Sequence, residues 1–117
     1  MGASSSRENE GAALEFIERT ITEHPVVIFS KSYCPYCTLA KDVMKQAGVP
    51  FHVVELDRKS DEPSGADIQS ALKQKTGRRT VPNVFLSKET IGGGSDVEAL
   101  FQSGKLTEML KAAGVLQ

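Results

Sequence analysis

A Cys-x-x-Cys pair, placed where an apolar run meets a helical pattern, is the feature that most constrains this chain. Cys34 and Cys37 are the only cysteines of the sequence, and they enclose Pro35 and Tyr36. The β-branched apolar run at residues 26–29 precedes the pair, and a helical pattern follows it. A Cys-x-x-Cys between a strand and a helix is typical of a redox site in a strand–helix–strand unit. The sequence therefore predicts a reactive dithiol at the centre of the fold.

The position of Cys34 favours an ionised, reactive sulfur. We expect Cys34 at the start of a helix, with Pro35 in the first turn, where a fixed φ and a missing N–H cost least. Free N–H groups and the positive end of the helix dipole would face this sulfur, and Lys31 adds a cation nearby. Cys37 lies on the same side of the helix, and we expect it to be the more buried thiol. Cys34 is thus the expected nucleophile and Cys37 the expected resolving thiol.

Two other interpretations of the cysteines are inert core thiols and half of a zinc site. Inert cysteines would not need a lysine before them and a proline between them. A zinc site usually has four ligands, and the two histidines of the chain, His24 and His52, are far apart in sequence on opposite sides of the motif. We therefore favour redox chemistry and expect no bound metal.

Length and composition indicate one globular domain. A chain of 117 residues with 39% hydrophobic and 25% charged residues can bury a single core. The formal net charge of −1 gives no argument for a nucleic-acid partner. No apolar run approaches the ~20 residues of a membrane span. Two cysteines are too few for a disulfide scaffold and no signal peptide is evident, so we expect a reducing, cytoplasmic compartment. We also expect a monomer.

The first nine residues are small and polar, and we expect a flexible tail before a domain spanning residues 10–117. They match the Met-Gly-x-x-x-Ser pattern of N-myristoylation, with Gly2 as the acceptor and Ser6 in the favoured position. A plain disordered tail explains the same composition. One acyl chain without a basic cluster would bind membranes only weakly, so a membrane partner is expected only if Gly2 is acylated.

Hydrophobic periodicity and turn residues predict an α/β chain. Helices are expected at about 10–23, 35–47, 65–76, 96–103 and 106–113. Strands are expected at about 26–29, 51–56, 83–86 and 89–91, the first two forming a parallel unit with a right-handed crossover and the last two a hairpin. The capping-box patterns Ser64-x-x-Asp67 and Ser95-x-x-Glu98 are expected to start the third and fourth helices.

A second constellation combines the run Gly92-Gly93-Gly94 with Ser95 and Asp96. Glycines let a ligand approach the backbone closely, and the helix start behind them offers free N–H groups to a carboxylate. Asp96 could pair with an ammonium group. Together these residues suit the carboxylate and amine of an α-amino acid. A flexible turn before an ordinary capped helix explains the same pattern.

A third constellation is the turn Thr80-Val81-Pro82 before a predicted strand. If the Val81–Pro82 bond were cis, the backbone N–H and C=O of Val81 would face outward and could pair with an extended peptide. A cis bond is found at only ~5–6% of such positions. Arg78 and Arg79 add positive charge nearby, and for at least one of them we favour a solvated loop position.

These three constellations, in this order, resemble the glutaredoxins over residues from about 14 to 116. The resemblance implies a thioredoxin-like α/β fold, a four-stranded mixed sheet flanked by about five helices, with a cis Pro82. It implies a dithiol glutathione-disulfide oxidoreductase that uses glutathione as cosubstrate and reduces protein–glutathione mixed disulfides and protein disulfides. The implied glutathione contacts are Lys31, Tyr36, Gln69, Thr80, Val81, Pro82, Gly93, Gly94, Ser95 and Asp96.

The resemblance also leaves an alternative function, a carrier or sensor of a [2Fe–2S] cluster ligated by the first cysteine and glutathione. Pro35 argues against this alternative, because cluster-binding glutaredoxins usually have a small residue there. A thioredoxin served by its own reductase is disfavoured, since such sites usually contain tryptophan and this chain has none. Some relatives carry a third cysteine at the position of Gly94, and this chain excludes regulation by that thiol.

Overall fold

The computed structural model describes the backbone of residues 2–117, with side chains described from residue 9 onward. Four strands form one sheet in the order β2-β1-β3-β4. The strands are β1 (Val26–Ser30), β2 (His52–Glu55), β3 (Asn83–Leu86) and β4 (Glu89–Gly92). Strand β1 pairs parallel with β2 and antiparallel with β3, and β3 pairs antiparallel with β4. The mixed sheet agrees with the expected architecture.

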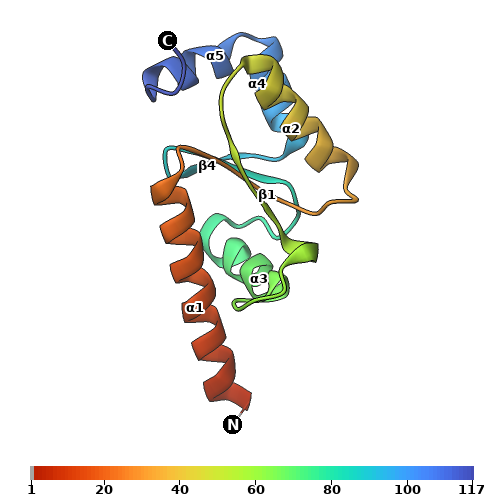
Figure 1. Ribbon diagram of the computed structural model, residues 1–117, viewed down its shortest axis with the longest axis vertical. Coiled ribbons are helices and arrows are strands. Elements are labelled where there is room, and N and C mark those ends of the chain that lie inside the picture. The colour runs from red at the N-terminus through yellow and green to blue at the C-terminus, as the bar shows by residue number, and fades with distance from the viewer. Residues whose placement is uncertain (1) are drawn as a thin grey trace.

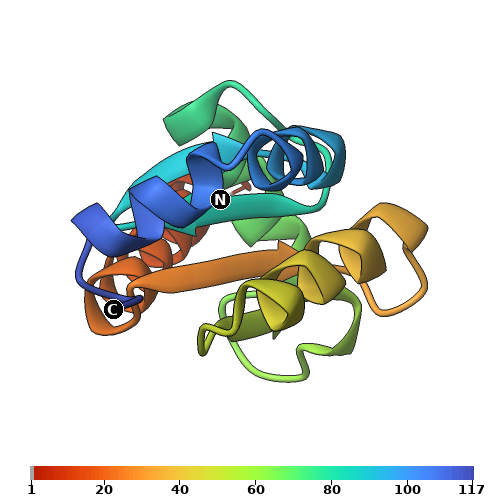
Figure 2. The same ribbon diagram turned by 90° about the horizontal axis from the view of Figure 1, so that it is seen from above.

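Helices cover both faces of this sheet (Figure 1). The five α-helices are α1 (Gly2–Glu23), α2 (Pro35–Ala47), α3 (Gly65–Thr76), α4 (Gly94–Gln102) and α5 (Lys105–Ala112), and a short 3-10 helix, η1 (Leu56–Arg58), follows β2. Helices α1 and α3 contribute to the core on one face, and α2, α4 and α5 to the core on the other. Figure 2 shows the same layers from above.

Strand β1 is buried on both faces, as its apolar run predicts. Val27 and Phe29 belong to the core beneath α1 and α3, whereas Val26 and Ile28 belong to the core beneath α2, α4 and α5. The rings of Phe29 and Phe85 meet edge to face with centroids 5.6 Å apart. Because both faces are filled, β1 is a rigid support for the loop that leaves its carboxyl end.

Helix α1 begins at Gly2, earlier than the start near residue 10 that the apolar stripe predicts. The stripe marks only the part that packs on the sheet, and Ala13 is the first buried side chain among those described in α1. Residues 2–9 contain no proline that would stop the helix. The mobility of residues 1–9 stays a prediction, and the proposed acylation of Gly2, with Ser6 beside it, falls outside the residues whose side chains are described.

The two predicted capping boxes had different outcomes. Ser64 caps α3 as expected, because its side chain accepts a hydrogen bond from the Asp67 N–H at 3.2 Å. The prediction of a box formed by Ser95 and Glu98 was wrong. Helix α4 starts after Gly93, whose N–H donates to Asp96 Oδ2 at 2.8 Å. The carboxylate that reaches back to the helix start is thus Asp96, and α4 begins two residues earlier than expected.

Candidate functional site

The Cys-x-x-Cys pair lies where β1 delivers the chain to α2. Cys34 is the residue before the first turn of α2, with extended backbone angles (φ −90°, ψ 120°), and Pro35 begins the helix. Cys34 is partly exposed whereas Cys37 is fully buried, and both are free cysteines. The expected order of an accessible first thiol and a sheltered second thiol is therefore the one that the fold produces.

The buried thiol of Cys37 is held by the loop before it. The backbone N–H of Lys31 donates to Cys37 Sγ at 3.4 Å. Burial raises the pKa of Cys37, the Lys31 N–H partly offsets this rise, and the neighbouring Cys34 side chain adds to it. Burial thus favours the protonated form of the Cys37 thiol.

An unexpected carboxylate anchors the loop that precedes Cys34. Asp57, in η1, accepts hydrogen bonds from the backbone N–H of Ser32 at 2.9 Å and from its hydroxyl group. Arg58 Nε also donates to Ser32 Oγ, at 3.2 Å. The hydroxyl and N–H of Ser32 hold the pKa of Asp57 below its ordinary value. Sequence reasoning did not find this contact, because it joins residues 25 positions apart and has no local pattern.

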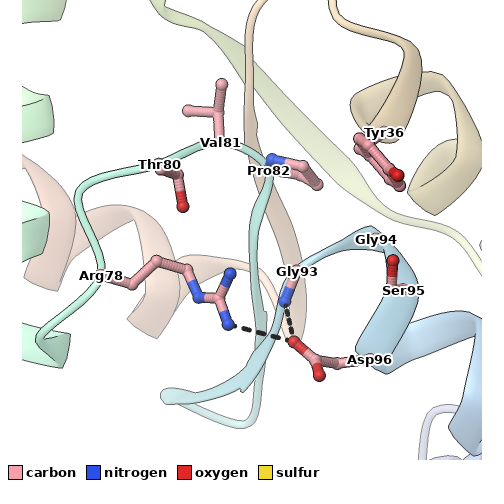
Figure 3. A pocket seen from close by; sticks show the side chains of 9 residues that line it. All are labelled: Tyr36, Arg78, Thr80, Val81, Pro82, Gly93, Gly94, Ser95 and Asp96. Carbon is pink, nitrogen blue, oxygen red and sulfur yellow. Dashed lines mark hydrogen bonds and ion pairs between the residues drawn. The ribbon is translucent and has the colours of Figure 1, made fainter.

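A cavity of about 340 Å³ opens beside Tyr36, the residue between Pro35 and Cys37 (Figure 3). It is lined by Tyr36 of α2, by the loop before β3 and by the first turn of α4. The lining residues are Tyr36, Arg78, Thr80, Val81, Pro82, Gly93, Gly94, Ser95 and Asp96. The fold therefore joins the three constellations that the sequence analysis singled out separately.

Val81 links this cavity to the first cysteine. The Cys34 thiol lies 3.8 Å from the carbonyl oxygen of Val81, close enough for a weak S–H···O hydrogen bond. The Val81–Pro82 peptide bond is cis, as the resemblance implies. A ligand in the cavity that contacts the Val81 backbone would thus lie beside the Cys34 sulfur.

Two of the implied contact residues do not line the cavity. Lys31 contributes its backbone, since its carbonyl accepts from the Cys34 N–H at 3.1 Å and its N–H faces Cys37. Gln69 lies on α3 and donates from Nε2 to the Arg79 carbonyl at 3.0 Å, which ties the loop before β3 to that helix. Direct ligand contacts by the Lys31 and Gln69 side chains stay predictions.

Arg78 lines the cavity although the sequence analysis did not place it in the site. Its Nη2 atom lies 3.1 Å from Asp96 Oδ2 in an ion pair across the cavity (Figure 3). Arg79, the next residue, is exposed and does not line the cavity. No local signal separates two consecutive arginines in one loop, because the difference between them arises from the contact with α4.

The glycine run is closely packed, which answers the alternative of a flexible turn. A Cβ atom on Gly94 would lie 2.6 Å from the carbonyl oxygen of Tyr36, and one on Gly93 would lie 2.8 Å from Arg78 Nη1. Both glycines are buried. Their lack of a side chain lets α4 approach α2 and leaves room for the Arg78 guanidinium.

The two histidines, distant in sequence, are brought together by the fold. The rings of His24 and His52 stack with centroids 4.0 Å apart. Over the described part of the chain, no group of three or more His, Cys, Asp or Glu side chains is arranged to hold a metal ion.

None of the described helices is long and apolar enough to cross a membrane.

Comparisons with known proteins agree with this geometry. A family model described as Glutaredoxin matches residues 26–91. Glutaredoxin-C6 of Oryza sativa is 46% identical over 104 residues, which cover 89% of this chain and 90% of that protein. Glutaredoxin-C4 of Arabidopsis thaliana is 45% identical over 100 residues, or 86% of this chain and 72% of that protein. A buckwheat glutaredoxin–glutathione complex superposes with a TM-score of 0.86 at 41% identity, covering 94% of this chain and 97% of that one.

Proposed function

This chain belongs to the glutaredoxin family of thiol oxidoreductases, and we propose that it is a glutathione-dependent thiol–disulfide oxidoreductase of the dithiol type. One observation carries the proposal: the partly exposed Cys34 at the start of α2 faces the Val81 carbonyl at the edge of the cavity. The cavity volume, about 340 Å³, lies in the range of small-ligand sites. The buckwheat relative of the same fold was solved in complex with glutathione.

In the proposed monothiol reaction, the Cys34 thiolate attacks the glutathione sulfur of a protein–glutathione mixed disulfide. The protein thiolate leaves and takes up a proton, and Cys34 carries the glutathione in a new disulfide. A second glutathione thiolate then attacks the bound glutathione sulfur. Oxidised glutathione forms and the Cys34 thiolate is released. The free N–H groups at the start of α2 stabilise this thiolate in both steps.

In the proposed dithiol reaction, Cys34 attacks one sulfur of a protein disulfide and forms a mixed disulfide with the client. The Cys37 thiolate then attacks the Cys34 sulfur, and the client thiol leaves. The product is a Cys34–Cys37 disulfide, which two glutathione molecules reduce in turn. The i, i+3 spacing on α2 places the two sulfurs on one side of the helix, as this closure requires.

The proposed glutathione site assigns one part of the tripeptide to each wall of the cavity. The Val81 backbone pairs with the cysteine of glutathione like an added strand. The segment 93–96 takes the γ-glutamyl end at the start of α4. Lys31 and Gln69 are assigned to the glycine carboxylate, and Tyr36 and Pro82 line the groove.

A glutathione-coupled reduction assay on the wild-type protein and two cysteine variants tests the proposal. We expect Cys34→Ser to abolish turnover with both protein–glutathione mixed disulfides and protein disulfides. Cys37→Ser should keep the first activity and lose the second, because only the second needs a resolving thiol. Full turnover of Cys34→Ser with glutathione mixed disulfides would refute the assignment. Thioredoxin reductase, used in place of glutathione and its reductase, should not support turnover by the wild-type protein.

The purified protein also allows a test of the cluster-binding alternative, and further measurements test the predicted compartment and oligomeric state. Visible iron–sulfur absorbance in protein purified anaerobically would favour a glutathione-ligated [2Fe–2S] carrier. We place the oxidoreductase in the cytosol as a monomer that acts on glutathionylated or disulfide-containing proteins. Fractionation and sedimentation measurements test those assignments.

A further inference from the structure

Among the residues whose side chains are described, Arg78 is the one cation in the wall of the cavity. It enters from the loop before β3, and its guanidinium points toward Asp96 on the first turn of α4 (Figure 3). The Arg78 and Asp96 side chains are 38% and 54% exposed, so water and ligands reach both. The opposite wall is formed by Tyr36 and Pro82, which bring no charge to the cavity.

The two oxygens of the Asp96 carboxylate have different surroundings. Oδ2 accepts from the Gly93 N–H at 2.8 Å and from Arg78 Nη2 at 3.1 Å. Within the described residues, Oδ1 makes no hydrogen bond. One oxygen therefore fixes the carboxylate in place, while the other remains available to a cationic group that enters the cavity.

The local structure also fixes Arg78. Its backbone N–H donates to Thr76 Oγ1 at 3.1 Å, and Asn83, which is buried in β3, donates to the same oxygen at 3.1 Å. The guanidinium lies against the backbone of Gly93, where a Cβ atom would come within 2.8 Å of Nη1. A guanidinium has five N–H donors in a planar fork, and the bond to Asp96 uses one of them. The remaining donors suit a carboxylate, which can accept two parallel bonds from such a fork.

We propose that Arg78 is a specificity-determining residue that binds the α-carboxylate of the ligand's γ-glutamyl group, while Asp96 Oδ1 accepts from the ammonium group of the same α-carbon. This inference rests on the proposed function and adds a residue to it. The Arg78 guanidinium then lies between the Asp96 carboxylate and the α-carboxylate of the ligand. The Asp96 carboxylate lies between Arg78 and the ammonium group of the ligand, so each charge has an opposite charge beside it. The site therefore selects a ligand end that carries both an amine and an acid, and it disfavours an end from which the acid is missing.

Two mixed disulfides with 2-mercaptoethanol test this assignment. One contains glutathione, and the other contains 4-aminobutyryl-Cys-Gly, which is glutathione without its α-carboxylate. In a single turnover, the Cys34 thiolate displaces 2-mercaptoethanol and forms a disulfide with the tripeptide. We expect Arg78→Gln to lower the second-order rate constant with the glutathione compound about tenfold and to change that with the analogue less than about twofold.

The matched control is Arg19→Gln, which removes the same charge from an exposed position on α1. Arg19→Gln should leave both rate constants unchanged. A loss with Arg19→Gln equal to that with Arg78→Gln would overturn the inference, because net charge would then explain the result. An equal loss with both compounds in Arg78→Gln would also overturn it, because Arg78 would then act through the shape of the loop.

The wild-type protein provides a test that does not depend on any variant folding correctly. It should react about tenfold faster with the glutathione compound than with the analogue. Equal wild-type rates would overturn the role of Arg78 while leaving the proposed function intact. Failure of the wild-type protein to react with the glutathione compound would instead overturn the proposed function itself.

Discussion

The backbone N–H of Lys31 donates to the Sγ atom of Cys37, 3.4 Å away, so the loop before the active-site turn is bonded to the buried thiol. The Cys34 thiol faces the carbonyl oxygen of Val81 on the other side. The two sulfurs of one motif thus have different neighbours, a donor for the buried sulfur and an acceptor for the accessible one. Burial outweighs the Lys31 N–H and raises the pKa of Cys37, which predicts a pH dependence for any step in which Cys37 reacts.

The closing step of the proposed dithiol reaction should accelerate as pH rises. Burial raises the pKa of Cys37 above its ordinary value, so its thiolate fraction still increases through pH 7–8. We expect the mixed disulfide at Cys34 to resolve up to about tenfold faster per pH unit in that range. Acid quenching followed by mass spectrometry measures the decay of the mixed disulfide. A resolution rate that is constant between pH 6 and pH 8 would contradict this expectation.

Asp57→Asn should reduce stability at neutral pH but not in strong acid. Bonds from Ser32 depress the pKa of Asp57 in the folded protein, so the ionised carboxylate stabilises the fold above the ordinary carboxyl range. This contribution is lost as pH falls through the depressed pKa. In urea unfolding at pH 7, the variant should have a lower free energy of unfolding than the wild type. Below pH 3 the two free energies should be equal. Asp42→Asn, at an exposed carboxylate on α2, should show no such difference.

His52→Gln should weaken the acid sensitivity of the fold. Burial, followed by the charge of the stacked His24, lowers the pKa of His52 below its ordinary 6.5. The unfolded chain then binds a proton at this residue more readily than the folded chain, so stability falls as pH drops below about 6.5. Thermal unfolding at pH 8 and pH 5 should show a smaller decrease in Tm for the variant. If Tm falls by the same amount in the variant and the wild type, groups other than His52 cause the acid sensitivity.

Gly65→Ala and Gly11→Ala should shift stability in opposite directions. A Cβ atom on Gly65 would lie 2.0 Å from the backbone oxygen of Leu56, which cannot move without displacing η1. We expect this substitution to cost about 1–3 kcal/mol. No atom lies within 4 Å of the corresponding position on Gly11, in the exposed part of α1. There, alanine should stabilise the helix by about 0.5–1 kcal/mol, and denaturant unfolding compares the two.

The order of helices and strands could be predicted because its signals are local. The apolar run before Cys34 predicts a buried strand, and β1 occupies it. Gly48 and Gly77, each following a helical pattern, end α2 and α3 with left-handed backbone angles, as glycine at a helix end commonly does. Such signals depend on residues a few positions apart. The start of α4 differs from the prediction because Ser95 and Asp96 both suit a helix start, and in the structure Asp96 Oδ2 accepts from the Gly93 N–H.

The site was only partly predictable, because some of its features depend on residues close in sequence and others on contacts between distant segments. The pair Cys34 and Cys37 could be recognised from its spacing, since a separation of one helical turn leaves the first thiol partly exposed and the second buried. The bonds of Ser32 with Asp57 and of Arg78 with Asp96 join segments that are adjacent only after the sheet has formed. The sequence by itself determined a Cys-x-x-Cys pair at a helix start and a glycine-rich turn before a later helix. The tertiary structure alone decided which charged side chains lie near the dithiol, because contacts between segments distant in sequence produce no repeating pattern in the sequence.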